Sequence, residues 1–424
     1  MSKDKQPEIR FPGFTDEWEQ RKFNNCFNFP VSTNSLSRAM LNYDNGEIKN
    51  IHYGDILIKY STILNVKEDE IPYITGGELE KYKSNLLENQ DLIFADAAED
   101  ESVGKAVEVS GITNENLVSG LHTIVARVKG EKAPFFWGYY INSDIYHRQL
   151  LRLMQGSKVS AISKGNLQKT NVSFPNRMKE QQKIGTFFKQ LDDTIALHQR
   201  KLDLLKETKK GFLQKMFPKN GAKVPEIRFP GFTEDWEERK LNEGMTEYTD
   251  RVYIQDDEIY KQVSVKNVGE ITLRGEQIGS KIGRKRQAKV NLIEHPDTLI
   301  FTRQTIEQGG IGFAPKETDG AIVTENMPTI DVDNDIINCN YLLAYVKTED
   351  WYRKVILKNI EGGTAQIAIH EDSILSSEVL IPKIEEQQKI GTFFKQIDDT
   401  IALHQSKLDL LKETKKGFLQ KMFV

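Results

Sequence analysis

The residue types that could carry catalysis are present, but they form no familiar catalytic pattern. The sequence holds no G-x-x-x-x-G-K-[ST] phosphate loop, and GGIGFAP at 309–315 lacks the third glycine of a dinucleotide fingerprint. No Asn/Asp-Pro-Pro-aromatic motif, as used by amino-methyltransferases, is present. The seven histidines are scattered, with no H-E-x-x-H and no Cys/His cluster. We therefore expect no catalytic site in this chain, and no metal or cofactor bound by it.

Cationic side chains form a clearer binding pattern. The segment SKIGRKRQAK at 280–289 carries five cations in nine residues: Lys281, Arg284, Lys285, Arg286 and Lys289. Such a run can neutralise DNA phosphates and place an arginine on guanine, although a solvated loop is an equally good interpretation. A second stretch, 151–177, has no acidic residue and contains Arg152, Lys158, Lys164, Lys169 and Arg177.

Two Gly-rich turns, QGSKVSAIS and EGGTAQIAI, add polar groups that could read base edges. These groups are Gln155, Ser157, Ser160, Thr364 and Gln366, and we include Arg303 in the same candidate set. The charge balance opposes a wholly basic surface, because residues 23–177 hold 16 cations and 18 acids, and residues 241–383 hold 16 and 23. DNA binding would therefore need a local face, or a partner that supplies phosphate contacts.

Length and composition set the broad class. The 424 residues, 38% hydrophobic and 28% charged, are typical of a globular protein with two or three domains. No stretch approaches the roughly 20 apolar residues of a membrane span, and the polar start suggests no export signal. With only Cys26 and Cys339, we expect no disulfide framework and a cytoplasmic location.

The chain consists of two copies of the same arrangement of segments. PEIRFPGFTDEWEQRK at 7–22 returns as PEIRFPGFTEDWEERK at 225–240, an offset of 218 residues (225 minus 7). The segment 180–217 returns at 386–423 with only Leu191/Ile397 and Arg200/Ser406 changed, an offset of 206 (386 minus 180). Each half is therefore a short motif, a variable domain and a long segment, with PKNGAKV at 218–224 as the joint.

The long repeated segment predicts a helix, because its apolar residues recur at alternating steps of four and three over five heptads. At about 1.5 Å per residue, 38 residues span about 57 Å. We expect the two helices to pair antiparallel, which buries both seams. The alternative is that each seam packs on its own domain or on a partner. The seam residues are Ile184, Phe188, Leu191, Ile195, Leu202, Leu205, Phe212, Ile390, Phe394, Ile397, Ile401, Leu408, Leu411 and Phe418.

Four polar residues interrupt this seam. We interpret His198 and His404 as residues that set the helix register, with a ligand or catalytic role as the less favoured alternative. Lys209 and Lys415 are expected to snorkel or to pair with acids across the seam.

The variable domains are predicted to have a mixed α/β fold. Strand-like runs at 91–96, 122–128, 297–302 and 329–332 alternate with turns. A shorter amphipathic helix is predicted at about 134–154 and at about 340–358, each followed by a Gly-rich turn and a strand. The predicted organisation is a motif at 1–22, domains at 23–177 and 241–383, helices at 178–217 and 384–424, and a joint with the second motif at 218–240.

These features together resemble the specificity subunit of type I restriction–modification enzymes, systems of phage defence. The resemblance rests on the double PEIRFPGFT motif, the double helix segment and the divergent domain inside each half, and it covers essentially the whole chain. It implies a non-catalytic protein of mixed α/β fold with a pseudo-two-fold repeat. Two target recognition domains would each read one half of a bipartite, asymmetric DNA sequence, and an antiparallel coiled coil would set the gap.

The resemblance also implies partners. Two modification subunits would bind S-adenosylmethionine and methylate adenine, and restriction subunits would use ATP, with Mg, to translocate DNA. Two other interpretations remain: a coiled-coil interaction scaffold without a DNA role, and a DNA-modifying enzyme in its own right. The family's DNA contacts lie in its variable domains and do not transfer to individual residues here.

The PEIRFPGFT motif is expected to act as a clasp. Its apolar Ile9, Phe11, Phe14 and Trp18 suggest packing on a helix end, with a turn at Pro12–Gly13. If the helices are antiparallel, the first copy should lie near the end of the second helix. Direct docking of a partner is the alternative role.

Overall fold

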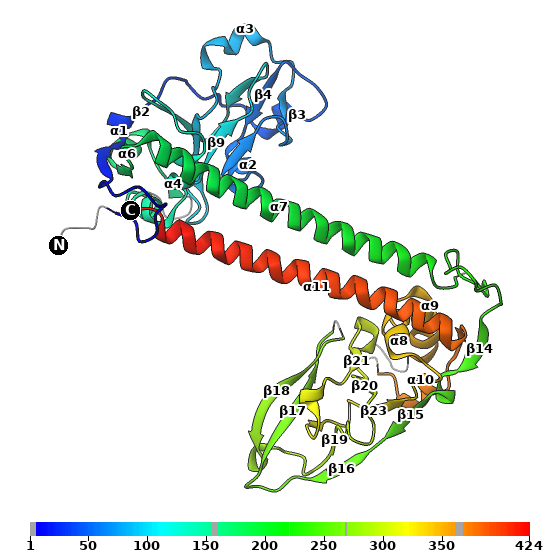
Figure 1. Ribbon diagram of the computed structural model, residues 1–424. Coiled ribbons are helices and arrows are strands. Elements are labelled where there is room, and N and C mark those ends of the chain that lie inside the picture. The colour runs from blue at the N-terminus through cyan, green and yellow to red at the C-terminus, as the bar shows by residue number, and fades with distance from the viewer. Residues whose placement is uncertain (1–5, 155–159, 220, 268, 361–367) are drawn as a thin grey trace. The chain divides into compact units, whose positions relative to one another are not determined.

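The computed structural model describes residues 6–154, 160–219, 221–267, 269–360 and 368–424 (Figure 1). The chain divides into two compact units, one formed by Met1–Gln199 with Ser406–Val424 and the other by Arg200–Gln405. Both divisions fall inside the long helices. Each unit therefore contains the first part of one helix and the last part of the other.

The two long helices are α7 (Met178–Lys215) and α11 (Ile384–Lys421), each of 38 residues. The predicted helices are thus confirmed, and all the predicted seam positions are buried or partly buried. His198, in the first unit, is among the buried residues, with 8% of its surface exposed.

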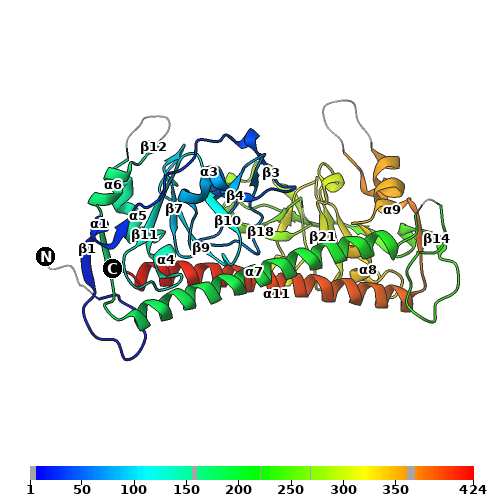
Figure 2. The ribbon, with the colours of Figure 1, turned by 90° about the horizontal axis from the view of Figure 1, so that it is seen from above.

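Within each unit the two helical segments run antiparallel (Figures 1 and 2). In the first unit Phe187 of α7 meets Phe418 of α11, with ring centroids 5.2 Å apart. In the second unit Phe212 meets Phe393 at 5.0 Å. The seam lysines pair with acids as expected, because Lys415 Nζ lies 2.5 Å from Asp192, and Lys209 pairs with Asp398. Both ion pairs join the same two positions of the repeat.

The repeated motif clasps the helix ends. The Ile9 amide donates to the Lys421 carbonyl at the end of α11, at 3.0 Å, and the Ile227 amide donates to the Lys215 carbonyl at the end of α7, at 2.9 Å. The prediction that the first copy lies at the end of the second helix is confirmed. Trp18 and Trp236 are both buried, each with 2% of its surface exposed.

Each clasp also holds the start of a helix through a buried ion pair. Arg10 Nε and Nη2 donate to the two carboxylate oxygens of Glu180 at 2.7 and 2.9 Å. Arg228 makes the same fork to Glu386 at 2.6 and 2.7 Å. Both glutamate side chains are 1% exposed, so losing either arginine would leave a buried carboxylate without its cation, at a cost of about 3–5 kcal/mol.

The variable domain of the first unit is built on short strands and helices. Its strands are β1 (Glu19–Lys22), β2 (Phe27–Asn28), β3 (Leu41–Asn42), β4 (Ile48–Ile51), β5 (Ile63–Asn65), β6 (Tyr73–Ile74), β7 (Leu92–Ala95), β8 (Ala97–Ala98), β9 (Ala106–Ser110), β10 (Asn116–Ser119), β11 (Thr123–Val128), β12 (Ser160–Ala161) and β13 (Asn171–Phe174). Its helices are α1 (Phe23–Cys26), α2 (Tyr53–Ile58), α3 (Leu79–Tyr82), α4 (Phe136–Ile141), α5 (Asp144–Leu151) and α6 (Lys164–Lys169), with 3-10 turns η1 (Arg38–Met40) and η2 (Lys83–Asn85).

Among the described residues, the variable domain of the second unit has longer strands and fewer α-helices. Its strands are β14 (Glu237–Lys240), β15 (Met245–Tyr248), β16 (Asp250–Tyr253), β17 (Ile259–Val265), β18 (Ile271–Ile278), β19 (Arg286–Lys289), β20 (Thr298–Phe301), β21 (Ile311–Phe313), β22 (Ile322–Val323), β23 (Thr329–Val332) and β24 (Glu378–Ile381). Its helical elements are η3 (Leu241–Glu243), η4 (Gly279–Lys281), η5 (Ile306–Gln308), η6 (Lys316–Thr318), α8 (Cys339–Tyr345), α9 (Glu349–Trp351), the π-helical η7 (Tyr352–Ile356), η8 (Leu357–Asn359) and α10 (Glu371–Leu375).

Of the two larger sheets in each domain, one has the same strand order in both domains, and we call it the shared sheet, whereas the other differs. The strand order β2-β11-β7-β9 in the first domain matches β15-β23-β20-β21 in the second, with antiparallel neighbours in both. The first domain extends this sheet by β5 and adds a sheet of order β10-β4-β6-β3, whereas the second adds a sheet of order β16-β19-β22-β17-β18. The predicted strands at 91–96, 122–128, 297–302 and 329–332 are confirmed as β7, β11, β20 and β23, all in the shared sheet.

The predicted short helices at about 134–154 and 340–358 are wrong as continuous elements. In the first domain α4 ends at Ile141, and the Ser143 side chain accepts from the Tyr146 amide to begin α5. In the second domain Thr348 begins α9 in the same way. Serine and threonine compete with the helix backbone for hydrogen bonds, so they favour a new start over a continuous helix.

A glycine in each long helix lets these short helices approach closely. A Cβ at Gly185 would lie 2.4 Å from the Pro134 carbonyl oxygen, and one at Gly391 would lie 2.6 Å from the Tyr341 amide nitrogen. Both distances are too short for a real side chain. The two positions are equivalent in the repeat, so the same contact seats each variable domain on its helix.

The first unit contains the end of α11, and the second unit contains the end of α7. We therefore predict that the first unit needs the last residues of α11 for its stability and that the second unit needs those of α7. Phe423 is buried in the first core against Trp18 and Phe188, and the equivalent Phe217 is buried in the second core against Trp236. Phe423→Ala should destabilise the first unit by about 3–5 kcal/mol, and Phe217→Ala the second.

Hydrogen exchange of the shared sheets measures this effect. F423A should speed exchange in β7 and β11, and F217A should speed it in β20 and β23. Equal effects of either variant on both sheets would contradict the two-unit organisation.

Candidate nucleic-acid interface

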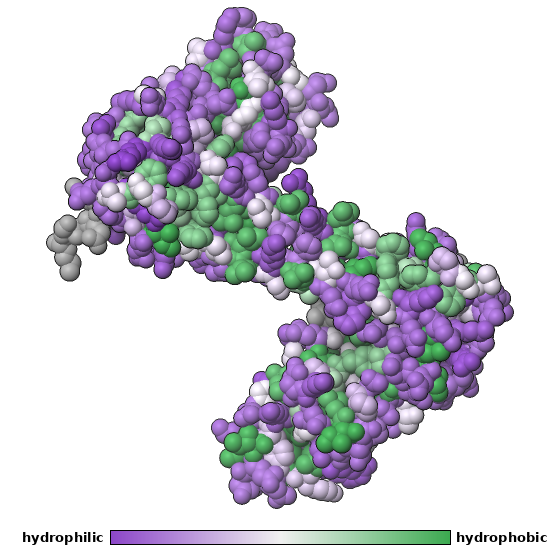
Figure 3. All heavy atoms as spheres, in the orientation of Figure 1, coloured by the Kyte–Doolittle hydropathy of each residue, from purple (hydrophilic) through white to green (hydrophobic). Residues whose placement is uncertain are grey.

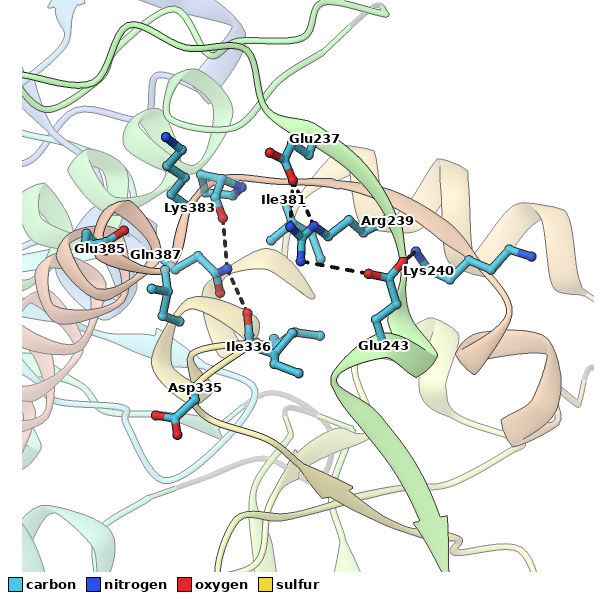
Figure 4. A pocket seen from close by; sticks show the side chains of 13 residues that line it. Glu237, Arg239, Lys240, Glu243, Asp335, Ile336, Ile381, Lys383, Glu385 and Gln387 are labelled. Carbon is cyan, nitrogen blue, oxygen red and sulfur yellow. Dashed lines mark hydrogen bonds and ion pairs between the residues drawn. The ribbon is translucent and has the colours of Figure 1, made fainter.

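One pocket in the second unit lies where the variable domain joins α11. It has a volume of about 240 Å³ and is lined by β14, β24 and the start of the helix (Figure 4). The Gln387 side chain donates to the carbonyls of Pro382 and Ile336 at 3.0 and 3.1 Å, and Arg239 bonds Glu237 at 2.7 Å. Gln181 makes the matching bond to the Pro175 carbonyl, at 2.8 Å, in the first unit. The Gln387 side chain thus joins the start of α11 to the variable domain, which indicates a structural pocket.

A larger cleft in the second domain is rich in arginine. Its volume is about 530 Å³, and its walls come from β15, β16, β19, the segment after β20, and the segment between β22 and β23 with the first residue of β23. The lining residues are Glu247, Tyr248, Thr249, Arg251, Arg284, Arg286, Gln287, Ala288, Arg303, Thr324, Glu325, Met327, Pro328 and Thr329.

Strand pairing brings two of these arginines onto one face. In the antiparallel β16–β19 pair, Arg251 lies opposite Ala288 and Tyr253 lies opposite Arg286. Opposite residues and alternate residues share a face, so Arg251, Tyr253 and Arg286 project on the same side. All three are exposed, and Tyr253 has 63% of its surface free. Exposed guanidinium groups beside an exposed ring are suited to phosphates and base faces.

Two other arginines of the cleft are held by acids. Arg303 Nε donates to Glu371 Oε2 at 2.7 Å, and its Nη2 bonds the other carboxylate oxygen. Arg284 pairs with Glu325. Glu247 and Glu325 also line the cleft, and burial together with the nearby Glu371 raises the pKa of Glu247. These pairs orient the guanidinium groups and reduce the net positive charge of the cleft.

Only part of the predicted run 280–289 lies in the cleft. Arg284 and Arg286 line the cleft, whereas Lys281, Lys285 and Lys289 do not. Lys285 pairs with Asp256 and donates to the Gly279 carbonyl at 2.7 Å, and Lys289 lies 3.4 Å from Asp250. Lys281 ends η4 and Lys289 ends β19, so the run is divided between a 3-10 turn, a connecting segment and a strand.

The predicted cations of the first domain lie on α5, α6 and the ends of these helices. Arg152 follows α5 and is exposed, and Lys164 begins α6 with its ammonium 4.6 Å from the centre of the Phe29 ring. Lys169 ends α6, and its carbonyl accepts from Lys22 at 3.1 Å. Arg177 pairs with Asp16 at 2.7 Å. Gln155, Ser157, Lys158, Thr364 and Gln366 lie outside the described residues.

Sequence reasoning missed a second polar cluster in the first domain, around the start of α2. Arg38 Nη1 donates to Asp55 Oδ2 at 2.8 Å, and the His52 ring accepts from the Gly54 amide. Burial, with Arg38 nearby, lowers the pKa of His52. The Tyr53 and His122 rings meet at 5.3 Å. Arg251 and Tyr253 were missed as well, although their alternation in DRVY is a strand signal.

Within the described residues, no group of three or more His, Cys, Asp or Glu side chains is placed to hold a metal ion. No described helix is long and apolar enough to cross a membrane.

Comparisons with known proteins agree with this architecture. A family model described as the type I restriction modification DNA specificity domain matches residues 15–207 and again residues 223–413. A putative type I restriction enzyme MjaX specificity subunit of Methanocaldococcus jannaschii is 21% identical, over 95% of this chain and 92% of its own. The MjaVIII specificity subunit of the same organism is 22% identical, over 66% and 69%.

A solved structure has the same fold. The crystal structure of a type I restriction–modification system S subunit from M. genitalium aligns with a TM-score of 0.61 at 11% identity, covering 99% of each chain. The two matched regions correspond to the two halves of the repeat. The chain therefore belongs to the family of type I restriction–modification DNA specificity proteins, and it carries the specificity domain twice.

Proposed function

We propose that this DNA specificity subunit reads a bipartite, asymmetric target, with residues 23–177 reading one half-site and residues 241–383 reading the other. The observation that carries the proposal is the contrast between a shared sheet and a divergent second sheet. The shared sheet, the clasp and the helix joints give both domains the same mounting. The different second sheets give them different surfaces, as two different half-sites require.

In the second domain we assign DNA contact to the arginine cleft. Arg251 and Arg286 are exposed on one face, and neither has an ion-pair partner among the described residues, so they are suited to phosphates. Arg284 and Arg303 are oriented by carboxylates, as base-reading groups are. The three lysines of the same run do not line the cleft, and we assign to them a longer-range attraction of DNA: Lys281, Lys285 and Lys289. The ion pairs of Lys285 with Asp256 and of Lys289 with Asp250 weaken this attraction.

In the first domain we assign DNA contact to the exposed cations of α5 and α6, Arg152, Lys164 and Lys169. Residues 151–177 carry no acid, so this face stays basic in a domain that holds 18 acids and 16 cations. A local basic face is enough to place DNA when a partner supplies further phosphate contacts.

We further propose that two modification subunits dock on equivalent surfaces of the helices. Four leucines at equivalent positions of the repeat are exposed: Leu197 (45%), Leu204 (68%), Leu403 (67%) and Leu410 (67%). The first unit holds Leu197 and Leu410, and the second holds Leu403 and Leu204. Figure 3 shows hydrophobic residues among hydrophilic ones on the visible face of the helices. Exposed leucines repeated in both units suit two copies of one partner.

Catalysis then lies with the partners. The modification subunits would supply S-adenosylmethionine and methylate adenine, and restriction subunits would supply ATP-driven translocation with Mg. The complex would work in the cytoplasm, where DNA and these cofactors are available. The absence of catalytic motifs in the sequence supports this division.

The target test is methylome sequencing of a host that carries this chain with its modification subunit and lacks other adenine methylation. We expect one bipartite motif with a methylated adenine in each half. A continuous or palindromic motif would contradict two different readers.

A second prediction concerns phosphate contact. Arg251→Ala and Arg286→Ala should each weaken DNA binding and make the negative slope of log K against log salt shallower by about 0.9, because binding with one phosphate contact fewer releases fewer counterions. Fluorescence anisotropy over a salt series measures the slope. Arg274→Ala, an exposed arginine on β18 that does not line the cleft, is the control and should leave the slope unchanged. Equal slopes for all variants would count against the cleft.

A third prediction concerns stoichiometry. A glutamate in an apolar interface loses hydration without a partner, so each leucine pair replaced by glutamate should block one docking surface. Native mass spectrometry should find two modification subunits on the wild type and one on the L197E/L410E or the L204E/L403E variant. K206E/K412E changes exposed lysines about 200° around each helix from Leu204 and Leu410 and should retain two. Two modification subunits bound to either leucine variant would contradict the assignment of the leucines to docking.

A further inference from the structure

One backbone position is the same in both variable domains but holds opposite charges. The Asp96 amide donates to the His122 carbonyl at 3.0 Å, and its carbonyl accepts from the Ile162 amide at 2.9 Å. The Arg303 amide donates to the Asn326 carbonyl at 3.0 Å, and its carbonyl accepts from the Ile369 amide at 3.0 Å. Two matching hydrogen bonds make Asp96 and Arg303 structural equivalents.

The place of this position in the fold supports the match. Asp96 comes one residue after β7, and Arg303 comes two residues after β20. Both strands lie between the same two neighbours of the shared sheet, β11 and β9 in one domain and β23 and β21 in the other. The shared scaffold therefore presents a side chain at one point in each domain, and the side chain differs in charge and reach.

In the second domain this side chain reaches the arginine cleft. Arg303 lines the cleft, and its side chain is 19% exposed. Glu371, at the first position of α10, takes the Nε and Nη2 groups. A guanidinium has five N–H donors in a fork, so a carboxylate on one edge leaves the edge with Nη1 for another acceptor.

In the first domain the equivalent side chain is an acceptor. Asp96 Oδ1 lies 3.2 Å from Nδ1 of His122, and the carboxylate side chain is 26% exposed. His122, which is 51% exposed, holds the carboxylate from one side much as Glu371 holds the arginine. Each position thus has one charged group, one neighbour that orients it and a partly open side.

We propose that this strand-end position reads a base in each half-site, with Arg303 donating to guanine and Asp96 accepting from the exocyclic amino group of cytosine. Arginine matches the O6 and N7 acceptors of guanine, and a carboxylate accepts from the cytosine N4 amino group. The inference rests on the proposed function and deepens it, because it names residues that make the two readers different.

Selection from a duplex library tests the assignment, using the full chain with its modification subunit. The wild type defines the motif first. Arg303→Gln should then shift or relax one guanine position in one half-site, because glutamine pairs with adenine. Asp96→Asn should relax one cytosine position in the other half-site. Each preference should change by about 5- to 150-fold, and the opposite half-site should keep its sequence.

Two partner variants separate base reading from a structural role. Glu371→Gln and His122→Ala remove the neighbours and leave Arg303 and Asp96 in place. Both should retain the wild-type bases, even with weaker overall binding. If E371Q altered the same base as R303Q, the arginine would act only through its ion pair, and the proposal would be overturned.

The outcomes also separate this inference from the function it rests on. A wild-type complex that selects no sequence overturns the proposed function and this inference with it. A wild-type motif that R303Q and D96N both leave unchanged overturns the inference alone. Arg303→Lys serves if R303Q does not fold, and it should weaken the guanine preference because lysine lacks the fork.

Discussion

The buried fork between the clasp arginine and the first turn of a long helix is the interaction on which the rest of each unit depends. Arg10 with Glu180 and Arg228 with Glu386 hold the start of one helix, while the amides of Ile9 and Ile227 hold the end of the other. One short motif therefore binds two helix ends at once. Because the glutamates are almost fully buried, the helix starts are anchored only while the clasp is in place.

This anchoring explains why the motif and the long helices are nearly identical in the two halves while the variable domains differ. In both units the motif contacts the helix ends, each helix glycine contacts the variable domain, and each seam lysine pairs with an acid of the other helix, so a change in any of them must be matched by its partner. Gly185 and Gly391 show the constraint plainly, since each leaves no room for a Cβ. The second sheets, by contrast, have different strand orders in the two halves.

The positive charge of the chain is balanced by acids, and few of the described cations stay unbalanced at the cleft. The chain has a net charge of −4, and several cations of the basic run are paired with acids of their own domain. Such pairing lowers non-specific attraction to DNA and orients the groups that remain in the arginine cleft. In the proposed reading position, the same backbone site carries an acceptor in one domain and a donor in the other. A common scaffold with one changed side chain is an economical way to distinguish two half-sites.

The repeat, the long helices, the clasp and four strands of the shared sheets followed from the sequence, because they depend on local periodicity and on segments copied almost unchanged. The continuous short helices predicted at about 134–154 and 340–358 were wrong, since Ser143 and Thr348 start new helices there. The arginine cleft is formed by β16, β19 and the segment after β20, and the match of Asp96 with Arg303 rests on hydrogen bonds to distant segments. Only the tertiary structure decided these features, because strand pairing and register bring together residues whose separation in the chain carries no local signal.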